Sequence, residues 1–361
     1  MTMAKKIKVA IGLSGGVDSS VAAYLLKQQG YEVIGLHLKL HDGIDPLHSR
    51  ACCSLDSSLD ARLVAHQLDI PFYVINLKES FQQYVIDPFV EQYQAGRTPN
   101  PCIECNKFIK FGAFLEKARQ LGCDNLATGH YATIYQQNGR YRIKQAKDSA
   151  KDQTYMLYGL TQDQLAHIIM PLGDIDSKDT VRRIAMELDL TAATAQDSQD
   201  ICFVPDDDHV AFLKQNVGSF EPGNFILDDQ VIGQHSGIEH FTIGQRKGLG
   251  VSWPEPLYVT RLEAQNRTVQ LGRAGDVFGK NLSGSQINLI YEDLAPGDTR
   301  EVNAKIRYAQ KAVPAKLIMD DNGSFRVYFK EDVRAITPGQ SVVFYLDDDL
   351  YGGGIIESKL S

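Results

Sequence analysis

Residues 10–26 have the sequence AIGLSGGVDSSVAAYLL. An apolar run ends in two glycines, an acid and two serines, after which a helical pattern begins. Gly15 and Gly16 can adopt positive φ angles, so their N–H groups can approach an anion closely. The helix that begins near Asp18 directs its positive end to the same place. The segment therefore predicts a buried strand, a phosphate-binding turn and a helix.

The turn differs from the two common nucleotide-binding fingerprints. A P-loop of the form GxxxxGK[ST] uses a lysine against the β- and γ-phosphates, and no lysine lies inside this turn. The glycines Gly12, Gly15 and Gly16 also do not fit the spacing GxGxxG. An ordinary serine-capped turn is the simpler interpretation, but SGGVDSS after a buried strand is a more specific pattern.

The first third of the chain alternates strands and helices. The apolar segments IKVAIGL, YEVIGLHL and FYVINL predict strands, and residues 18–29 and 57–68 predict helices between them. Further helices are expected over residues 81–93 and 105–121, followed by a short strand in NLATGHYA. This alternation predicts a doubly wound parallel sheet with helices on both faces. Ligands bind such sheets at the carboxyl ends of the strands.

The later segments have a different pattern. Asn138-Gly139 lies between alternating segments and predicts a β-hairpin. A helical pattern returns over residues 152–190, and the chain then becomes rich in β-segments and glycine. The fold class expected is an N-terminal parallel-sheet domain, a small central α+β domain that is rich in strands, and a C-terminal β-barrel. We place these domains at residues 1–205, 206–282 and 283–361.

Composition limits the function classes. The chain has 361 residues and a net charge of −8, which argues against indiscriminate nucleic-acid binding but permits a structured RNA held by local patches. No apolar run approaches the roughly 20 residues that span a bilayer. The basic start MTMAKK runs into the glycine turn without a cleavage site, so no signal peptide is expected and the cytoplasm is the expected location.

Six cysteines are present: Cys52, Cys53, Cys102, Cys105, Cys123 and Cys202. In a cytosolic chain they are more often catalytic, metal-binding or core residues than a disulfide framework. Cys123, in LGCDN, is interpreted as a core residue. Cys102 and Cys105 follow a proline-rich loop in GRTPNPCIECNKFIKFG, where a helix is expected to begin. A thiol at a helix N-terminus ionises readily, so this pair predicts reactive chemistry.

The string SGGVDSS resembles the PP-loop of the adenine-nucleotide α-hydrolase-like ATP pyrophosphatases. That resemblance implies cleavage of ATP between its α- and β-phosphates, with AMP passing to an acceptor. It explains a phosphate turn without the P-loop lysine, because pyrophosphate is the leaving group.

The motifs together resemble the family of tRNA-specific 2-thiouridylases. They are GLSGGVDSSVAA, GRTPNPCIECNKFIKF, LATGHYA, KDQTYML, DSQDICFV, TIGQRKGLG and KIRYAQ. The resemblance implies adenylation of the C2 oxygen of the wobble uridine in tRNA, followed by its replacement with sulfur. ATP, expected with Mg²⁺, tRNA and a persulfide sulfur-donor protein would be the partners, with no membrane involved and no metal ligands among the site residues.

The resemblance also implies roles for individual residues. Cys105 matches the nucleophilic cysteine and Cys202 the cysteine that carries the persulfide, so one donates sulfur and the other resolves the linkage as a disulfide. The residues that match the ATP site are Gly12, Leu13, Ser14, Gly15, Gly16, Val17, Asp18, Ser19, Leu38 and Gly129. The residues that match tRNA contacts are Asn100, Pro101, Cys102, Lys151, Asp152, Gln153, Arg307 and Tyr308.

One position departs from the commonest form of the family. Many members have an aspartate, a candidate general base, where this chain has Cys102. The proton acceptor could then be a Cys102 thiolate, Asp18, a substrate phosphate or water.

Three other functions are open on the sequence. The cysteines could ligate an iron–sulfur cluster or zinc, although adjacent cysteines are poor ligand pairs and CxxC also occurs in redox sites. An AMP-forming amide or amidine ligase would need an ammonia source, and no glutaminase-like segment is visible. A non-enzymatic RNA-binding module is disfavoured by the acidic balance and by the intact nucleotide turn.

Overall fold

The structure is a computed structural model that describes residues 6–41, 55–194 and 201–360. The chain divides into two compact units. The first unit comprises Met1–Val85, Cys102–Asp207 and Asp348–Leu350, and the second comprises Ile86–Pro101, Asp208–Asp347 and Tyr351–Ser361. Within the described ranges, no helix has both the length and the apolar character needed to cross a membrane.

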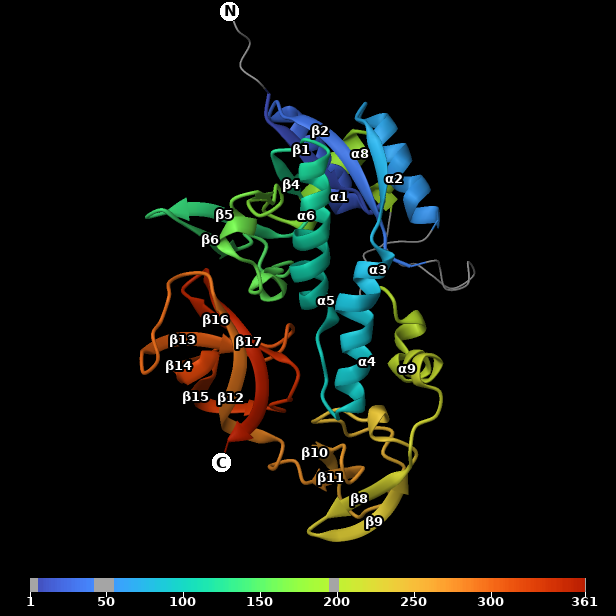
Figure 1. The fold of residues 1–361 in the computed structure, drawn as a ribbon, viewed down its shortest axis with the longest axis vertical. Helices are drawn as coiled ribbons and strands as arrows, with labels where there is room; N and C mark the ends of the chain where they lie inside the picture. Colours follow the sequence, from blue (N-terminus) through green and yellow to red (C-terminus); the bar gives the residue numbers. More distant parts are fainter. Residues whose placement is uncertain (1–5, 42–54, 195–200, 361) are drawn as a thin grey trace, which may run out of the picture. The chain divides into compact units, whose positions relative to one another are not determined.

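A five-stranded parallel sheet is the centre of the first unit (Figure 1). Its strand order is β3-β2-β1-β4-β7, and every neighbouring pair is parallel. The strands are β1 (Lys8–Gly12), β2 (Glu32–Lys39), β3 (Phe72–Asn76), β4 (Asn125–Ala127) and β7 (Ile168–Ile169). The predicted parallel sheet is therefore confirmed.

Helices cover both faces of this sheet because the side chains of a strand alternate between its faces. Val9 and Ile11 of β1 belong to one buried core with residues of α1 (Val17–Gln28), α2 (Leu55–Gln67) and α8 (Lys178–Glu187). On the other face, the Phe114 ring of α6 (Phe114–Gln120) comes within 3.2 Å of where a Cβ atom on Gly12 would lie. The sheet is thus doubly wound, as expected.

The helix after the proline-rich loop begins at Pro101, earlier than the predicted start at residue 105. It comprises α5 (Pro101–Glu104), the π-helical segment η2 (Cys105–Ala113) and then α6. Proline is favoured in the first turn of a helix, because it has no N–H to leave unsatisfied there. Cys102, rather than Cys105, therefore lies in the first turn. The expected helix over residues 81–93 comprises α3 (Lys78–Phe81), η1 (Gln82–Ile86) and α4 (Asp87–Gln94).

The predicted hairpin is confirmed. It consists of β5 (Ala132–Gln137) and β6 (Arg140–Gln145), and both turn residues have positive φ, 53° at Asn138 and 78° at Gly139. The helical pattern expected over residues 152–190 is wrong in part, since β7 interrupts it by joining the sheet beside β4. The remaining helical segments there are η3 (Thr154–Leu157), α7 (Gln162–Leu165) and α8, followed by η4 (Thr191–Thr194).

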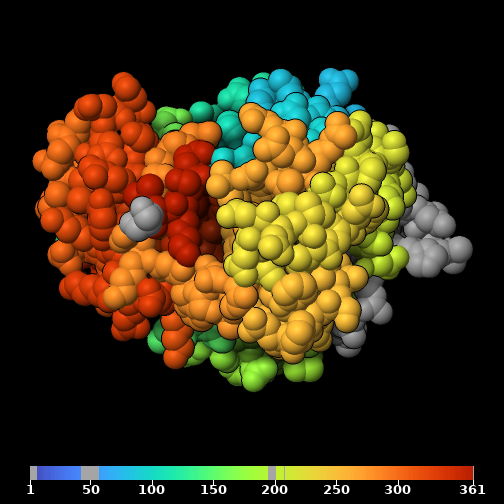
Figure 2. Space-filling view, turned by 90° about the horizontal axis from the view of Figure 1, so that it is seen from below, coloured from blue at the N-terminus to red at the C-terminus, as the bar shows by residue number. Residues whose placement is uncertain are grey.

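The second unit contains a four-stranded sheet with strand order β10-β11-β8-β9. Its strands are β8 (Gly223–Leu227), β9 (Gln230–His235), β10 (Tyr258–Glu263) and β11 (Thr268–Gly272), and β11 pairs with β8 in parallel. The hairpin of β8 and β9, in yellow, lies at the surface (Figure 2). The short helices of this part are η5 (Pro205–Asp207), α9 (His209–Val217) and η6 (Ile238–His240).

The C-terminal strands close into a barrel, as predicted. Their order is β12-β15-β14-β13-β16-β17, and β12 also pairs with β17, which closes the ring. Phe325 and Phe344 pack edge to face in its core, with ring centroids 5.7 Å apart. The elements are β12 (Phe278–Leu289), β13 (Thr299–Lys305), β14 (Val313–Met319), η7 (Asp321–Gly323), β15 (Phe325–Arg334), β16 (Ser341–Leu346) and β17 (Asp349–Leu360).

Candidate functional site

The loop between β1 and α1 is held in shape by its own serines. The Ser14 N–H donates to Ser19 Oγ at 3.2 Å, and the Gly16 N–H donates to Ser14 Oγ at 3.3 Å. The hydroxyls of Ser19 and Ser20 both donate to the Gly16 carbonyl, at 3.0 and 2.9 Å. Gly15 has φ of 81°, a conformation that favours glycine. Gly16 caps α1 without a side chain, so the first amides of the helix face the loop.

The Asp18 carboxylate in the first turn of α1 has two partners from distant elements. Lys178 Nζ contacts Asp18 Oδ1 at 2.7 Å and Oδ2 at 2.6 Å, and the Tyr131 hydroxyl donates to Oδ1 at 2.6 Å. The side chain of Lys178 is 10% exposed and that of Asp18 is 31% exposed. A lysine therefore does lie at the predicted nucleotide turn, but it is the first residue of α8.

Sequence reasoning missed both Lys178 and Tyr131. Tyr131 lies inside the recognised motif LATGHYA but was given no role. Lys178 follows Ser177, whose side chain caps α8 by accepting from the Thr180 N–H. That capping pattern is visible in the sequence, whereas the partner of the lysine is 160 residues away and is not.

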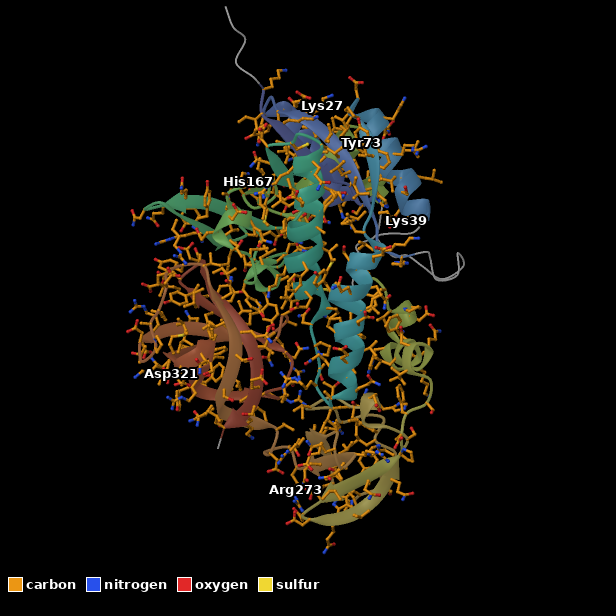
Figure 3. The ribbon with its side chains drawn as sticks, viewed as in Figure 1. Lys27, Lys39, Tyr73, His167, Arg273 and Asp321 are labelled. Carbon is orange, nitrogen blue, oxygen red and sulfur yellow. The ribbon has the colours of Figure 1, made fainter. Side chains whose placement is uncertain are left out.

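One predicted ATP-site residue, Gly129, packs against the loop, and another, Leu38, lies in the strand that pairs with β1. A Cβ atom on Gly129 would be 2.9 Å from the Ser19 nitrogen and 3.0 Å from the Asp18 carbonyl carbon, so only glycine fits there. Leu38 lies near the carboxyl end of β2, beside Lys39, which Figure 3 labels at that end of the strand. His37, which precedes Leu38, is buried, and the Nδ1 atom of His37 lies 2.8 Å from the Leu13 carbonyl oxygen. Burial lowers the pKa of His37.

The segment Lys151–Gln153, which was expected to contact tRNA, is tied to Tyr131. The Tyr131 N–H donates to Gln153 Oε1 at 3.0 Å, and the Gln153 N–H donates to the Tyr131 carbonyl at 3.0 Å. Asp152 is 8% exposed, and its carboxylate accepts from the Ala146 N–H and from the Thr154 hydroxyl. The Asp152 side chain therefore stabilises this turn. Its expected contact with tRNA stays a prediction.

The cysteines differ in exposure. Cys102 is exposed, Cys105 is 7% exposed and Cys202 is half-buried. The side-chain amide of Asn106, next to Cys105, donates to the Met156 carbonyl at 3.0 Å, which joins this helix to the segment KDQTYML. Beside Cys202, the Phe203 ring packs edge to face on Phe81, with centroids 5.6 Å apart.

Cys123 is buried, as expected of a core residue, and burial raises its pKa. Cys52 and Cys53 lie outside the described residues. Among residues 6–41, 55–194 and 201–360, no three His, Cys, Asp or Glu side chains are grouped so that they could hold a metal ion.

The proline-rich loop is anchored within the second unit. The Thr98 N–H donates to the Pro338 carbonyl at 3.0 Å, and the Gln340 amide donates to the carbonyls of Thr98 and Pro99. These contacts fix the chain just before Asn100 and Pro101. Arg97 adds a 2.7 Å ion pair to Glu357 of β17.

Arg307 and Tyr308 follow β13 in the second unit. Arg307 Nη2 donates to the Ile243 carbonyl and to the Thr337 hydroxyl, both at 3.1 Å, so the guanidinium has a structural role. Tyr308 is 40% exposed, and Lys305 Nζ lies 5.4 Å from its ring centroid. An exposed aromatic ring beside a cation suits contact with RNA, and the expected tRNA role of both residues stays a prediction.

Three family models match consecutive parts of the chain. The model described as the tRNA methyl transferase HUP domain matches residues 7–206. The tRNA methyl transferase PRC-barrel domain matches residues 210–273, and the aminomethyltransferase beta-barrel domain matches residues 280–356. The expected order of a parallel-sheet domain, a small middle domain and a C-terminal barrel is confirmed, and the boundaries given above stay a prediction.

Proteins of known name match almost the entire chain. The tRNA-specific 2-thiouridylase MnmA of Clostridium perfringens is 49% identical over 362 residues, which covers 99% of this chain and 100% of that protein. The tRNA-specific 2-thiouridylase MnmA 1 of Clostridium botulinum is 50% identical over 356 residues, with coverage of 98% and 99%.

A solved structure described as a 4-thiouridine synthetase–RNA complex with bound ATP is 16% identical, with a TM-score of 0.36 over 58% of this chain and 50% of that one. A likeness at that level supports no conclusion about this chain. The full-length matches, together with the glycine turn and the two cysteine motifs, decide the assignment: the chain belongs to the family of tRNA-specific 2-thiouridylases.

Proposed function

We propose that this protein is an ATP-dependent enzyme that replaces the C2 oxygen of the wobble uridine in tRNA with sulfur. The observation that carries the proposal is the full-length identity of 49% to a tRNA-specific 2-thiouridylase. The lysine-free serine and glycine loop and the three cysteines Cys102, Cys105 and Cys202 are consistent with it.

The first step activates the base. The loop residues Gly12 to Ser19 would bind ATP, with their amides directed at the phosphates and Gly129 packed against the loop. The C2 oxygen of uracil attacks the α-phosphate, the bond to the β-phosphate oxygen breaks, and pyrophosphate leaves. Adenylation makes a poor leaving oxygen into a good one.

Mg²⁺ would accompany ATP at this loop. Asp18 supplies a carboxylate, which is the protein ligand that Mg²⁺ takes together with phosphate oxygens. Since Lys178 and Tyr131 already bind that carboxylate, the ion would share Asp18 with them.

The second step transfers sulfur. The terminal sulfur of a persulfide on Cys202 attacks C2, and AMP leaves. The Cys105 thiolate then attacks Sγ of Cys202 and breaks the S–S bond, so the sulfur remains on the base and a Cys105–Cys202 disulfide forms. A thiol reductant restores both cysteines, and a persulfide-carrying protein of the cytoplasm reloads Cys202.

Three measurements test the proposal. Incubation with ATP labelled at the α-phosphate and tRNA should yield AMP, and mass spectrometry of that tRNA should show 2-thiouridine. ADP as the labelled product would contradict the PP-loop chemistry. The third measurement uses cells. tRNA from a strain that lacks this protein should contain no 2-thiouridine, and restoring the gene should restore the modification.

A further inference from the structure

We infer that Tyr131 is a positioning residue that couples tRNA binding at residues 151–153 to nucleotide binding at the loop that contains Asp18. The inference rests on the proposed function, which takes the loop as the ATP site, and on the predicted contact of residues 151–153 with tRNA.

Tyr131 contacts the Asp18 carboxylate through its hydroxyl. The residue is 2% exposed, and its hydroxyl donates to Asp18 Oδ1 at 2.6 Å. Hydrogen bonds to ionised groups are about twice as strong as those between neutral groups, so this contact restricts the first turn of α1.

Tyr131 reaches the tRNA segment through its backbone. Its N–H and its carbonyl both bond to Gln153, each at 3.0 Å. A shift of Gln153 would therefore move the Tyr131 backbone, and with it the hydroxyl that holds Asp18.

A second connection begins in the same segment and ends at the same carboxylate. The Lys151 N–H donates to the Asp148 carbonyl at 3.0 Å, and Asp148 Oδ2 accepts from the Lys178 N–H at 3.1 Å. Lys178 then binds Asp18 through its ammonium group. Both connections lie within the first unit.

This arrangement predicts the direction of the coupling. tRNA that binds residues 151–153 also orders Tyr131 and Asp18. ATP binding then loses less conformational entropy and becomes tighter. By linkage, ATP must tighten tRNA binding by the same factor.

The chain contains a matched control for Tyr131. Tyr135 lies in β5, four residues further on, and its hydroxyl also donates to a carboxylate, that of Asp349, at 2.7 Å. Tyr131→Phe and Tyr135→Phe therefore each remove one hydroxyl and one hydrogen bond to a carboxylate, and only the first touches the nucleotide loop.

The experiment measures binding rather than turnover. The probe is α,β-methylene-ATP, which cannot be cleaved between its α- and β-phosphates. Its Kd is measured for the full-length wild-type protein and both variants, with and without tRNA from a strain that lacks this protein. For wild type and Tyr135→Phe we expect tRNA to tighten binding at least about fivefold, the lower end of typical allosteric coupling. For Tyr131→Phe we expect the coupling factor to fall to about the square root of the wild-type factor, because one of the two connections to Asp18, and with it about half of the coupling free energy, is lost.

Coupling retained by Tyr131→Phe, coupling lost equally in Tyr135→Phe, or wild-type protein without coupling would overturn the inference. Thermal unfolding of the variants identifies a folding defect, and Lys178, still paired with Asp18, keeps the carboxylate compensated in Tyr131→Phe. The same tRNA is assayed for 2-thiouridine after incubation with ATP and a sulfur source. Wild-type thiolation without coupling would contradict the inference alone, whereas a failure to thiolate would contradict the proposed function.

Discussion

Lys178 and Asp18 form a bidentate ion pair across 160 residues of chain, with Nζ at 2.7 and 2.6 Å from the two carboxylate oxygens. The pair brings a cation to the predicted phosphate-binding turn, which has no lysine of its own. An acid beside the phosphates of ATP would repel them, and Lys178 offsets that charge. The turn therefore depends on α8 for its electrostatics.

Lys178→Met should weaken the binding of α,β-methylene-ATP by about ten- to a hundredfold. A charged hydrogen bond contributes about 1.5–3 kcal/mol, and the variant also leaves the charge of Asp18 uncompensated. Lys27→Met is the control, because Lys27 lies at the other end of α1 and bonds the Leu68 carbonyl instead. Equal affinities of both variants and wild type would show that Lys178 has no part in nucleotide binding.

Gly129→Ala should destabilise the first unit and weaken nucleotide binding. The new methyl group would lie 2.9 Å from the Ser19 nitrogen and 3.0 Å from the Asp18 carbonyl carbon. Both are backbone atoms, so no side-chain rotation can relieve the clash. Overpacking of this kind costs about 1–3 kcal/mol, measurable by urea denaturation. Gly275→Ala, which meets no atom within 4 Å, should leave both properties unchanged. A Gly129→Ala protein as stable and as tightly binding as wild type would contradict the packing argument.

The three candidate cysteines should give different defects. Cys202→Ser should accept no sulfur from a donor, whereas Cys105→Ser should accept sulfur on Cys202 and fail to thiolate tRNA. Cys102→Ser should slow turnover in part if its thiolate acts as a base. Mass spectrometry of the loaded protein and of the tRNA distinguishes these outcomes.

Cys123→Ala is the control for that series, because Cys123 is a buried core residue. Equal and complete inactivation by all three candidate substitutions, with iron bound to the parent protein, would favour a cluster over a persulfide.

Arg307→Ala should raise the KM for tRNA and make tRNA binding less sensitive to salt. Each phosphate contact contributes to the salt dependence of binding, so its loss reduces the slope of log K against log salt. Because Arg307 also bonds Thr337, Thr337→Val removes that structural contact and keeps the charge. An unchanged slope in Arg307→Ala, or the same KM defect in Thr337→Val, would assign Arg307 a purely structural role.

Glu104 should make stability depend on pH. Burial raises the pKa of Glu104 above its ordinary value of 4.5, and the nearby charge of Lys107 partly opposes this. A raised pKa in the folded state means that the folded protein holds the proton more tightly than the unfolded chain. This stabilising effect is present below pH 4.5 and is lost as the pH rises through the folded-state pKa.

Glu104→Gln should therefore lose less stability than wild type between about pH 4.5 and neutral pH, as measured by urea denaturation. Glu116→Gln, at an exposed position of α6, should follow the wild-type curve. If the free energy of unfolding of wild type and Glu104→Gln changed equally with pH, Glu104 would not be the source of the pH dependence.

The local features of the chain could be predicted because nearby residues encode them. The alternation of apolar segments predicted the parallel sheet, and Asn138-Gly139 predicted the hairpin, since both residues tolerate positive φ. Evenly spaced β-segments predicted the barrel. The start of the helix at Pro101 was not predicted, because Pro101 was interpreted as part of the proline-rich loop, whereas proline is also favoured in the first turn of a helix.

The sequence by itself determined the type of sheet, the lysine-free turn of serines and glycines and the two cysteine motifs, because each depends on residues within a few positions of one another. Only the tertiary structure decided that Lys178 and Tyr131 meet at Asp18, that Gly129 closes on the first turn of α1, and that Cys105 is buried while Cys102 is exposed. Those contacts join residues that are distant along the chain. No periodicity encodes them, because they follow from the order in which the strands enter the sheet.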